Sequence, residues 1–127
     1  FMIRFRKEHP VLRKPTRPAA CGFADISYHH GRAWNADCGN NARLIGLLYA
    51  GQDDAGADDL VFVGVNTYWE KLGMSFPDAP SGKRWMLVAD TAREEALPIN
   101  EPVAAGRYDL APRSVIVLTL CEKDDTR

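Results

Sequence analysis

The spacing of apolar residues along the chain changes near residue 13. Before that point, four apolar residues fall on one side of a helix wound over Phe1–His9: Phe1, Met2, Phe5 and Leu12. Pro10 restricts the residue before it and ends the regular turns, so the sequence predicts a short N-terminal helix. Residues 13–18 then combine prolines with cations, which is typical of an extended connector between two units.

After the connector, apolar residues alternate with a period of two in short runs separated by turn residues. The predicted strands are Asp25–His29, Arg43–Tyr49, Leu60–Asn66, Leu72–Phe76, Trp85–Asp90, Arg107–Leu110 and Ser114–Cys121, with a weaker one at Pro98–Val103. No second helix is predicted, so the strands must bury their apolar faces against one another. The expected fold class is all-β: an antiparallel Greek-key β-sandwich of about seven or eight strands, preceded by a short N-terminal helix.

Three segments carry more specific predictions. Ser114–Leu120 is continuously apolar and rich in β-branched residues, which predicts a central strand covered on both faces. Asp53–Asp59 holds four carboxylates between two strong strands, and we expect a solvated hairpin loop because those carboxylates cannot be buried together. Asp90 ends a strand and is expected to bond the backbone of its own turn.

Composition narrows the class of protein. The 127 residues are 46% hydrophobic and 26% charged, which fits one domain with a packed core. The formal charge of −1 disfavours a nucleic-acid partner. Three cysteines are an odd number, which favours a reducing compartment and predicts a cytoplasmic location. Apolar runs are of strand length, so no membrane partner is expected, and the first residues suggest a chain cut from a longer protein.

Catalytic and metal-binding motifs are missing from the sequence. It contains neither a nucleotide-binding glycine loop nor a Gly-x-Ser-x-Gly or His-Glu-x-x-His motif, so no catalytic residue is predicted. The most metal-like residues are Cys21, His29, His30 and Cys38. Their spacing is unlike the tight pairs of structural zinc sites, and adjacent histidines on a strand point to opposite faces. The favoured interpretation is two ordinary thiols and a surface histidine next to a half-buried one, with no metal and no cofactor.

Aromatic residues offer the clearest candidate binding surface. Tyr68 and Trp69 lie together at the end of a predicted strand, and Trp34 and Trp85 provide other flat faces. Tyr68, Trp69 and Trp34 are therefore candidate carbohydrate-binding residues, because an exposed aromatic ring can stack on a sugar. Packing in the core of a sandwich is the alternative for each of these rings.

Several segments follow one another in an order known from one enzyme family. They are Phe5–Arg13, Asp25–His29 with Gly31 and Trp34, Asn66-Thr67-Tyr68-Trp69-Glu70, Trp85–Ala92 and Tyr108–Leu118. Together they resemble the end of the last barrel helix and the strands after it in the glycogen-debranching and isoamylase group of glycoside hydrolase family 13. The third segment resembles that group's Asn-x-Tyr-Trp-Glu stretch, whereas Ala36–Asn41 departs from the group's pattern.

The resemblance implies a C-terminal β-sandwich, called domain C, fixed against a (β/α)₈ barrel that hydrolyses α-1,6-glucosidic branch linkages in glycogen or related α-glucans. It implies that residues 1–13 are a remnant of the last barrel helix and that residues 14–127 form the sandwich. A barrel needs roughly 250 residues, so the chain cannot hold one and no catalytic residue is carried over.

The expected function is a non-catalytic accessory domain of a debranching glycosidase. Its expected partners are the missing barrel of the same polypeptide and an α-glucan chain touched by a rim residue such as Trp69. One alternative is a free-standing carbohydrate-binding sandwich, and another is an immunoglobulin-like module that binds a different protein. Without the barrel, the face of Phe1, Met2 and Phe5 is expected to fold back on the sandwich or to drive self-association.

Overall fold

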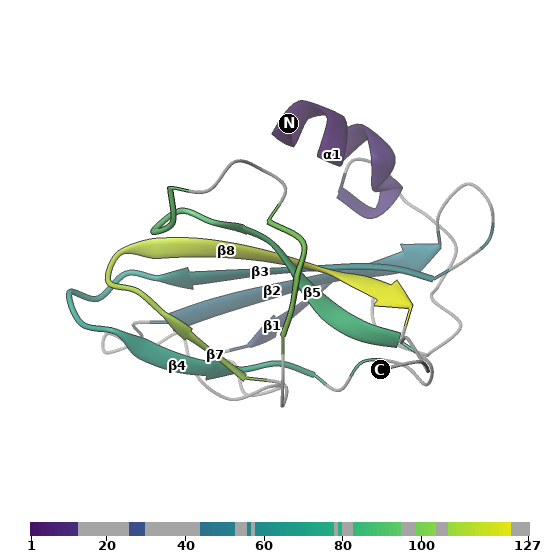
Figure 1. Ribbon diagram of the computed structural model, residues 1–127. Coiled ribbons are helices and arrows are strands. Elements are labelled where there is room, and N and C mark those ends of the chain that lie inside the picture. Colours follow the sequence, from purple (N-terminus) through teal and green to yellow (C-terminus); the bar gives the residue numbers. More distant parts are fainter. Residues whose placement is uncertain are drawn as a thin grey trace.

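The structure is a computed structural model with three layers. It describes residues 1–12, 26–29, 44–52, 56, 58–77, 79, 83–94, 99–103 and 107–122. Helix α1 (Met2–Glu8) and a short 3₁₀ turn, η1 (Pro10–Leu12), lie on one side of a six-stranded sheet, and a two-stranded sheet lies on the other (Figure 1). Among these residues, no helix has the length and apolar character needed to cross a bilayer.

Both sheets are antiparallel, which confirms the predicted all-β sandwich with a short N-terminal helix. The larger sheet contains, in spatial order, β1 (Ile26–His29), β2 (Leu44–Gln52), β3 (Asp58–Asn66), β8 (Ser114–Glu122), β5 (Lys83–Asp90) and β6 (Glu101–Pro102). The smaller sheet pairs β4 (Leu72–Ser75) with β7 (Arg107–Leu110). Strand β8 lies between β3 and β5, a non-sequential order of the kind that Greek-key connections produce.

The main core lies between the two sheets. Leu48, Phe62 and Leu118 pair in register across β2, β3 and β8, and all three are fully buried. Met74 comes from the smaller sheet to close this core. Gly46 is required beside it, because a Cβ there would lie 2.6 Å from the Cζ atom of Phe62. Period-two alternation therefore buries one complete face of the larger sheet.

A second cluster forms on the opposite, outer face of the larger sheet. Phe5 of α1 is its anchor, and it packs with four strand residues: Val61, Val88, Ala89 and Val117. Val117 on the outer face and Leu118 on the inner face confirm that β8 is a strand covered on both sides. Phe5 thus folds back on the sandwich as predicted.

The predicted apolar side of the helix is only partly buried. Leu12 also packs against the second cluster, whereas Phe1 and Met2 each remain 44% exposed. Pro10 was expected to end the regular turns, and α1 does end at Glu8, just before it. Pro10 itself starts η1. The first residue of such a turn needs no N–H donor, so proline fits there.

An irregularity in β5 redirects its last residues. The register shifts by one residue between Leu87 and Ala89, as in a β-bulge. Val88 and Ala89 therefore both reach the cluster under the helix. Asp90 then turns back toward the smaller sheet, where the Tyr108 hydroxyl donates to it.

The predicted solvated loop at Asp53–Asp59 is wrong at its end. Strand β3 begins at Asp58, and Asp59 is buried. Its Oδ1 lies 2.6 Å from Nδ1 of His9, a residue fifty positions earlier in the chain. A single carboxylate can be buried in this way because a specific partner meets it.

Candidate functional site

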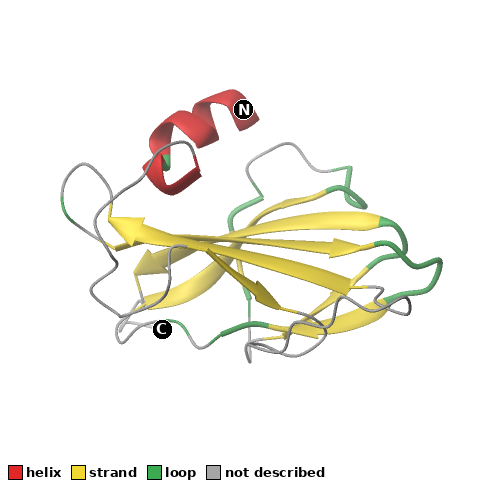
Figure 2. Cartoon of the chain, turned by 180° about the vertical axis from the view of Figure 1, so that it is seen from behind, coloured by secondary structure: helices red, strands yellow, loops and turns green. Residues whose placement is uncertain are grey.

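The candidate site is an aromatic corner, which we define as Tyr68 and Trp69. It belongs to the connection between β3 and β4, at the end of the larger sheet away from α1 (Figures 1 and 2). Trp69 is 66% exposed and Tyr68 is half-buried. Their ring centroids are 5.7 Å apart and their planes are tilted by 48°. The corner therefore presents a large indole surface to solvent beside a second aromatic ring.

Asn66, the last residue of β3, holds the backbone of this corner through the hydrogen bonds of its buried side chain. It is 1% exposed, and its Oδ1 accepts a hydrogen bond from the Tyr68 N–H at 2.8 Å. Its Nδ2 lies 3.0 Å from the carbonyl oxygen of Glu70. The same nitrogen lies 3.2 and 3.1 Å from the carbonyl oxygens of Leu110 and Ala111. One buried amide thus joins the β3–β4 connection to the end of β7.

The turn between β7 and β8 supports the corner from the other side. The Arg113 N–H donates to the Tyr68 carbonyl at 3.0 Å, and the Ser114 hydroxyl donates to the Ala111 carbonyl at 2.7 Å. Arg113 has a φ of 49°, a left-handed conformation that is uncommon for a residue other than glycine. The backbone of Tyr68 is therefore held at both its N–H and its carbonyl group.

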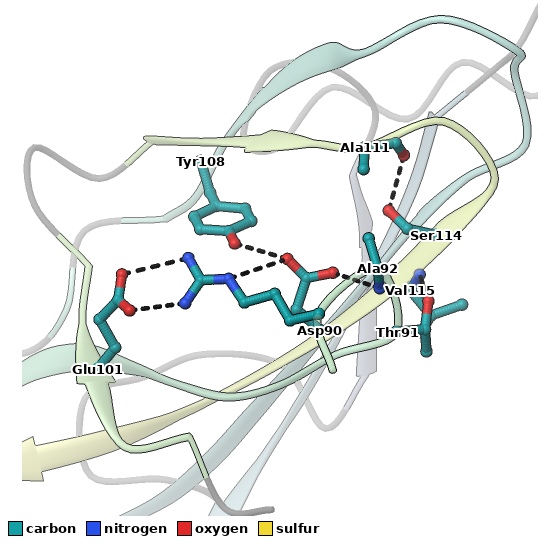
Figure 3. A network of polar contacts seen from close by, with 9 residues as sticks. Asp90, Thr91, Ala92, Glu101, Tyr108, Ala111, Ser114 and Val115 are labelled. Atoms are coloured by element: carbon teal, nitrogen blue, oxygen red, sulfur yellow. Dashed lines mark hydrogen bonds and ion pairs between the residues drawn. The ribbon is translucent and has the colours of Figure 1, made fainter. Parts of the chain in front are cut away.

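A polar network ties the two sheets together near the end of β5 (Figure 3). The Tyr108 hydroxyl donates to Oδ2 of Asp90 at 2.6 Å. Oδ1 of Asp90 accepts from the Ala92 N–H at 3.0 Å, which confirms the predicted bond to its own turn. Arg93 donates to both carboxylate oxygens of Glu101, at 2.6 and 3.3 Å. Strands β5 and β7 and residue Glu101 of β6 are linked in this way.

The protonation behaviour of the network fits a structural role. Burial, together with the hydrogen bond to Asp90, raises the pKa of Tyr108 to about 12. The hydrogen bond from Arg93 lowers the pKa of the Glu101 carboxyl. The general acid of a glycosidase needs a carboxyl whose pKa is raised, so Glu101 is unsuited to that task.

A second surface with exposed apolar residues lies on α1. We call Phe1, Met2 and Ile3 the helix surface; their exposed fractions are 44%, 44% and 78%. The C-terminal end of the helix is attached to the sheet by the pair of His9 and Asp59. The His9 ring also packs against Phe5, with centroids 4.2 Å apart. The helix is therefore docked through one end and one anchor.

The structure brings together two of the three predicted carbohydrate-binding residues. Tyr68 and Trp69 form the aromatic corner, and Trp34 lies outside the described residues. Trp85, the remaining flat face, is 3% exposed, and its Nε1 donates to the Pro77 carbonyl at 2.8 Å. Trp85 is therefore a core residue, and sugar binding at the corner stays a prediction.

Of the four candidate zinc ligands, the structure describes only His29. His29 is 2% exposed, with Nε2 at 2.9 Å from the Ser27 hydroxyl, and burial lowers the pKa of its imidazole. The other three, Cys21, His30 and Cys38, lie outside the described residues. Within the described ranges, no three His, Cys, Asp or Glu side chains gather as a metal site would require.

The structural roles of three residues, Asn66, His9 and Asp59, were not predicted from the sequence. An Asn two positions before Tyr68 at a strand end is a signal for a local side-chain turn, so part of the role of Asn66 was within reach. Its bonds to Leu110 and Ala111 span 44 and 45 residues and leave no local pattern. The same holds for the pair of His9 and Asp59.

Comparison with known proteins adds no relative. No protein-family model matches the chain, and no curated protein matches it either. Function is therefore argued from the sequence resemblance and from the geometry of the two exposed surfaces.

Proposed function

We propose that this chain is the non-catalytic C-terminal accessory domain of an α-glucan-debranching glycosidase. On this proposal it packs against a (β/α)₈ barrel of the same polypeptide and stabilises it, while the barrel hydrolyses α-1,6-glucosidic linkages. The sequence resemblance and the helix that precedes the sandwich support this assignment. A fold alone does not imply function, and the surface that supports docking is the outer face of the larger sheet.

The outer face of the larger sheet carries apolar residues at positions where a solvated face would carry polar ones. Ile45, Val65 and Val115 pair in register across β2, β3 and β8, on the face that also carries α1. Ile45 is 42% exposed, and the two valines are half-buried. An antiparallel sheet with one solvated face alternates apolar and polar residues, so this row favours a second covering surface.

The helix surface adds exposed apolar residues on the same side of the larger sheet. Helix α1 contacts the sandwich through Phe5, while Phe1, Met2 and Ile3 remain exposed. Large exposed apolar areas mark interaction sites on protein surfaces. The outer helix layer of a barrel is an occupant that would cover both the row on the sheet and the helix surface.

Three of the described carboxylates have structural partners, as expected of a domain without catalysis. Asp59 pairs with His9, Asp90 accepts from Tyr108, and Glu101 pairs with Arg93. Such pairing differs from an acid and a nucleophile left facing a substrate.

The first test of the proposal is the coding sequence of the gene. We expect the coding sequence before the Phe1 codon to encode, in frame, a (β/α)₈ barrel of roughly 250 residues. The purified chain should release no reducing ends from glycogen or pullulan. A reading frame without a barrel would favour a free-standing module, and reducing-end release by the chain alone would overturn the non-catalytic assignment.

A matched pair of variants then tests the proposed contact in the full-length protein. Ile45→Glu places a charge in the apolar row, whereas Lys71→Glu changes an exposed residue of the β3–β4 connection. We expect Ile45→Glu to lower the thermal midpoint of the barrel and Lys71→Glu to leave it unchanged. Equal midpoints for both variants would contradict docking through this face.

A further inference from the structure

The aromatic corner is distinct from the residues that carry the docking proposal, and its size limits what it could bind alone. A tryptophan side chain offers at most about 250 Å² of surface. A stable protein interface buries about 800 Å² on each partner, several times more than one indole provides. The exposed part of Trp69 is therefore too small to serve alone as a protein interface, and its area matches a single small ring.

The corner is rigid before any ligand arrives. The N–H of Tyr68 is held by the buried Asn66 side chain, and its carbonyl is held by the Arg113 N–H. Binding to a site that is already ordered avoids the entropic cost of arranging a mobile loop. A rigid backbone that holds a 66% exposed indole in water is the arrangement expected of a preformed stacking surface.

The residues that flank Trp69 define the chemistry of the ligand. Thr67, Glu70 and Lys71 are exposed on the same connection, and Arg113 is exposed on the adjoining turn. They supply a hydroxyl, a carboxylate, an ammonium and a guanidinium, which together donate and accept hydrogen bonds. The signs of charge are mixed, so the surroundings do not select an ionic ligand. Arg113 keeps its guanidinium there at a φ of 49°, a conformation that favours glycine.

We propose that the aromatic corner binds a pyranose ring of a neutral oligosaccharide, with the ring stacked on the Trp69 indole. A pyranose has an apolar face of C–H groups and a rim of hydroxyls, which matches an indole surrounded by polar side chains. The choice of an α-1,4-linked glucan as the oligosaccharide rests on the proposed function, whereas the choice of a pyranose rests on the corner itself.

The test is calorimetric titration of the full chain with maltoheptaose and, separately, with cellohexaose. Calorimetry is preferred to fluorescence because replacing Trp69 also removes the reporter. A ring of about twelve non-hydrogen atoms at ordinary ligand efficiency gives a Kd of order 1 mM. We expect Trp69→Ala to weaken binding about tenfold or more and Trp69→Phe about threefold. Ile26→Ala, which trims an exposed apolar residue of the edge strand β1, is the matched control and should leave Kd unchanged.

Each outcome decides a separate point. Maltoheptaose binding that depends on Trp69 supports both the corner and the α-glucan assignment. Binding of cellohexaose alone, still dependent on Trp69, supports the corner and overturns the α-glucan assignment. No binding of either sugar, or binding that Trp69→Ala leaves intact, overturns the corner as a sugar site, while the barrel proposal is still judged by its own experiments.

Discussion

The helix surface and the aromatic corner both hold large apolar side chains in water, yet they are supported in different ways. The helix surface belongs to a helix of seven residues whose buried residue is Phe5. An isolated helix of that length is unstable in water, so α1 depends on its contacts with the sheet. Those contacts are the Phe5 anchor and the pair of His9 and Asp59 at its foot.

The aromatic corner lies in a connection between strands, and its backbone is fixed by the buried Asn66 side chain and by the Arg113 N–H. Asn66 alone contacts four backbone groups there. A weakly supported apolar surface is completed by a partner that also stabilises it, which suits protein docking. A rigid aromatic surface keeps its shape without a partner, which suits a small ligand. Substitutions at the two surfaces and in the polar network should therefore have different effects on stability and on binding.

The largest effect is expected from Asn66→Ala. The change removes the side-chain donor from the buried carbonyl group of Leu110 and frees the Tyr68 N–H, whereas the Ala111 carbonyl keeps the Ser114 hydroxyl as a donor. We expect the free energy of unfolding to fall by about 2–4 kcal/mol in urea denaturation. The matched control, Lys71→Ala on the exposed part of the connection, should stay within about 0.5 kcal/mol of the wild type.

The same variant should separate the two surfaces. Native-state hydrogen exchange in Asn66→Ala should become faster at the amide of Arg113, whereas the amide of His9, which bonds the Phe5 carbonyl, should lose protection only through the global change in stability. A selective loss of protection at the His9 amide would show that the corner and the helix are coupled, which would contradict their independent support.

An intermediate effect is expected from Phe5→Ala. Phenylalanine truncation in a core costs about 3–5 kcal/mol. We expect a smaller loss of about 2 kcal/mol here, because α1 can detach while the sandwich stays folded. Phe62→Leu, a milder truncation in the fully buried main core, serves as a reference for global unfolding in the same urea series.

The readout for Phe5→Ala is again local. The amide of His9 should exchange nearly as fast as in a free peptide, and the exchange of β8 amides should change little. If β8 amides lose protection in proportion to those of the helix, α1 is an integral part of the sandwich and the helix surface is not a separable docking element.

A smaller effect, with a defined pH range, is expected from Tyr108→Phe. The hydroxyl donates to Asp90, so its loss should cost about 1 kcal/mol at neutral pH. Burial and that hydrogen bond raise the pKa of Tyr108 to about 12, above the ordinary value of about 10 for tyrosine. The folded state therefore holds this proton more tightly than the unfolded state does. Its contribution is complete below pH 10 and is lost as the pH rises through 12.

Urea midpoints measured from pH 8 to pH 12 check this sign. The difference between wild type and Tyr108→Phe should be constant up to about pH 10 and should shrink above it. The other tyrosines contribute equally to both proteins, so the difference isolates Tyr108. A gap that widens toward high pH would mean that the hydroxyl ionises more easily in the folded state.

Local patterns in the sequence were sufficient to predict most of the fold. Alternation of apolar residues placed the strands, and the uninterrupted β-branched run at Ser114–Leu120 identified the central strand, because both features follow from the geometry of a single strand. The extra residue in β5 was not predictable, since a bulge becomes visible only when the partner strand is known. The bulge nevertheless decides that Val88 faces the helix and Asp90 faces Tyr108.

The candidate site shows the same difference between features set by one segment and features set by distant segments. Tyr68 and Trp69 were singled out because they are adjacent, and the turn at Asp90 was predicted because its acceptor and donor are two residues apart. The buried state of Asp59 was missed because its partner, His9, is fifty residues away. Short-range chemistry can be inferred from one segment, whereas long-range pairing requires the assembled sheet.

The smallest effects on stability are expected at the exposed side chains themselves, and they separate the two surfaces most directly. Ile3→Ser and Trp69→Ser each remove an apolar side chain that is more than 60% exposed, so neither should change the free energy of unfolding by more than about 0.5 kcal/mol. Their effects on binding should differ. Ile3→Ser should weaken association between the chain and a separately produced barrel and leave maltoheptaose binding unchanged, whereas Trp69→Ser should do the reverse. Light scattering measures the first property and calorimetry the second. If one variant impairs both properties, the two surfaces form a single interface, and the difference in their support would reflect local packing rather than two separate tasks.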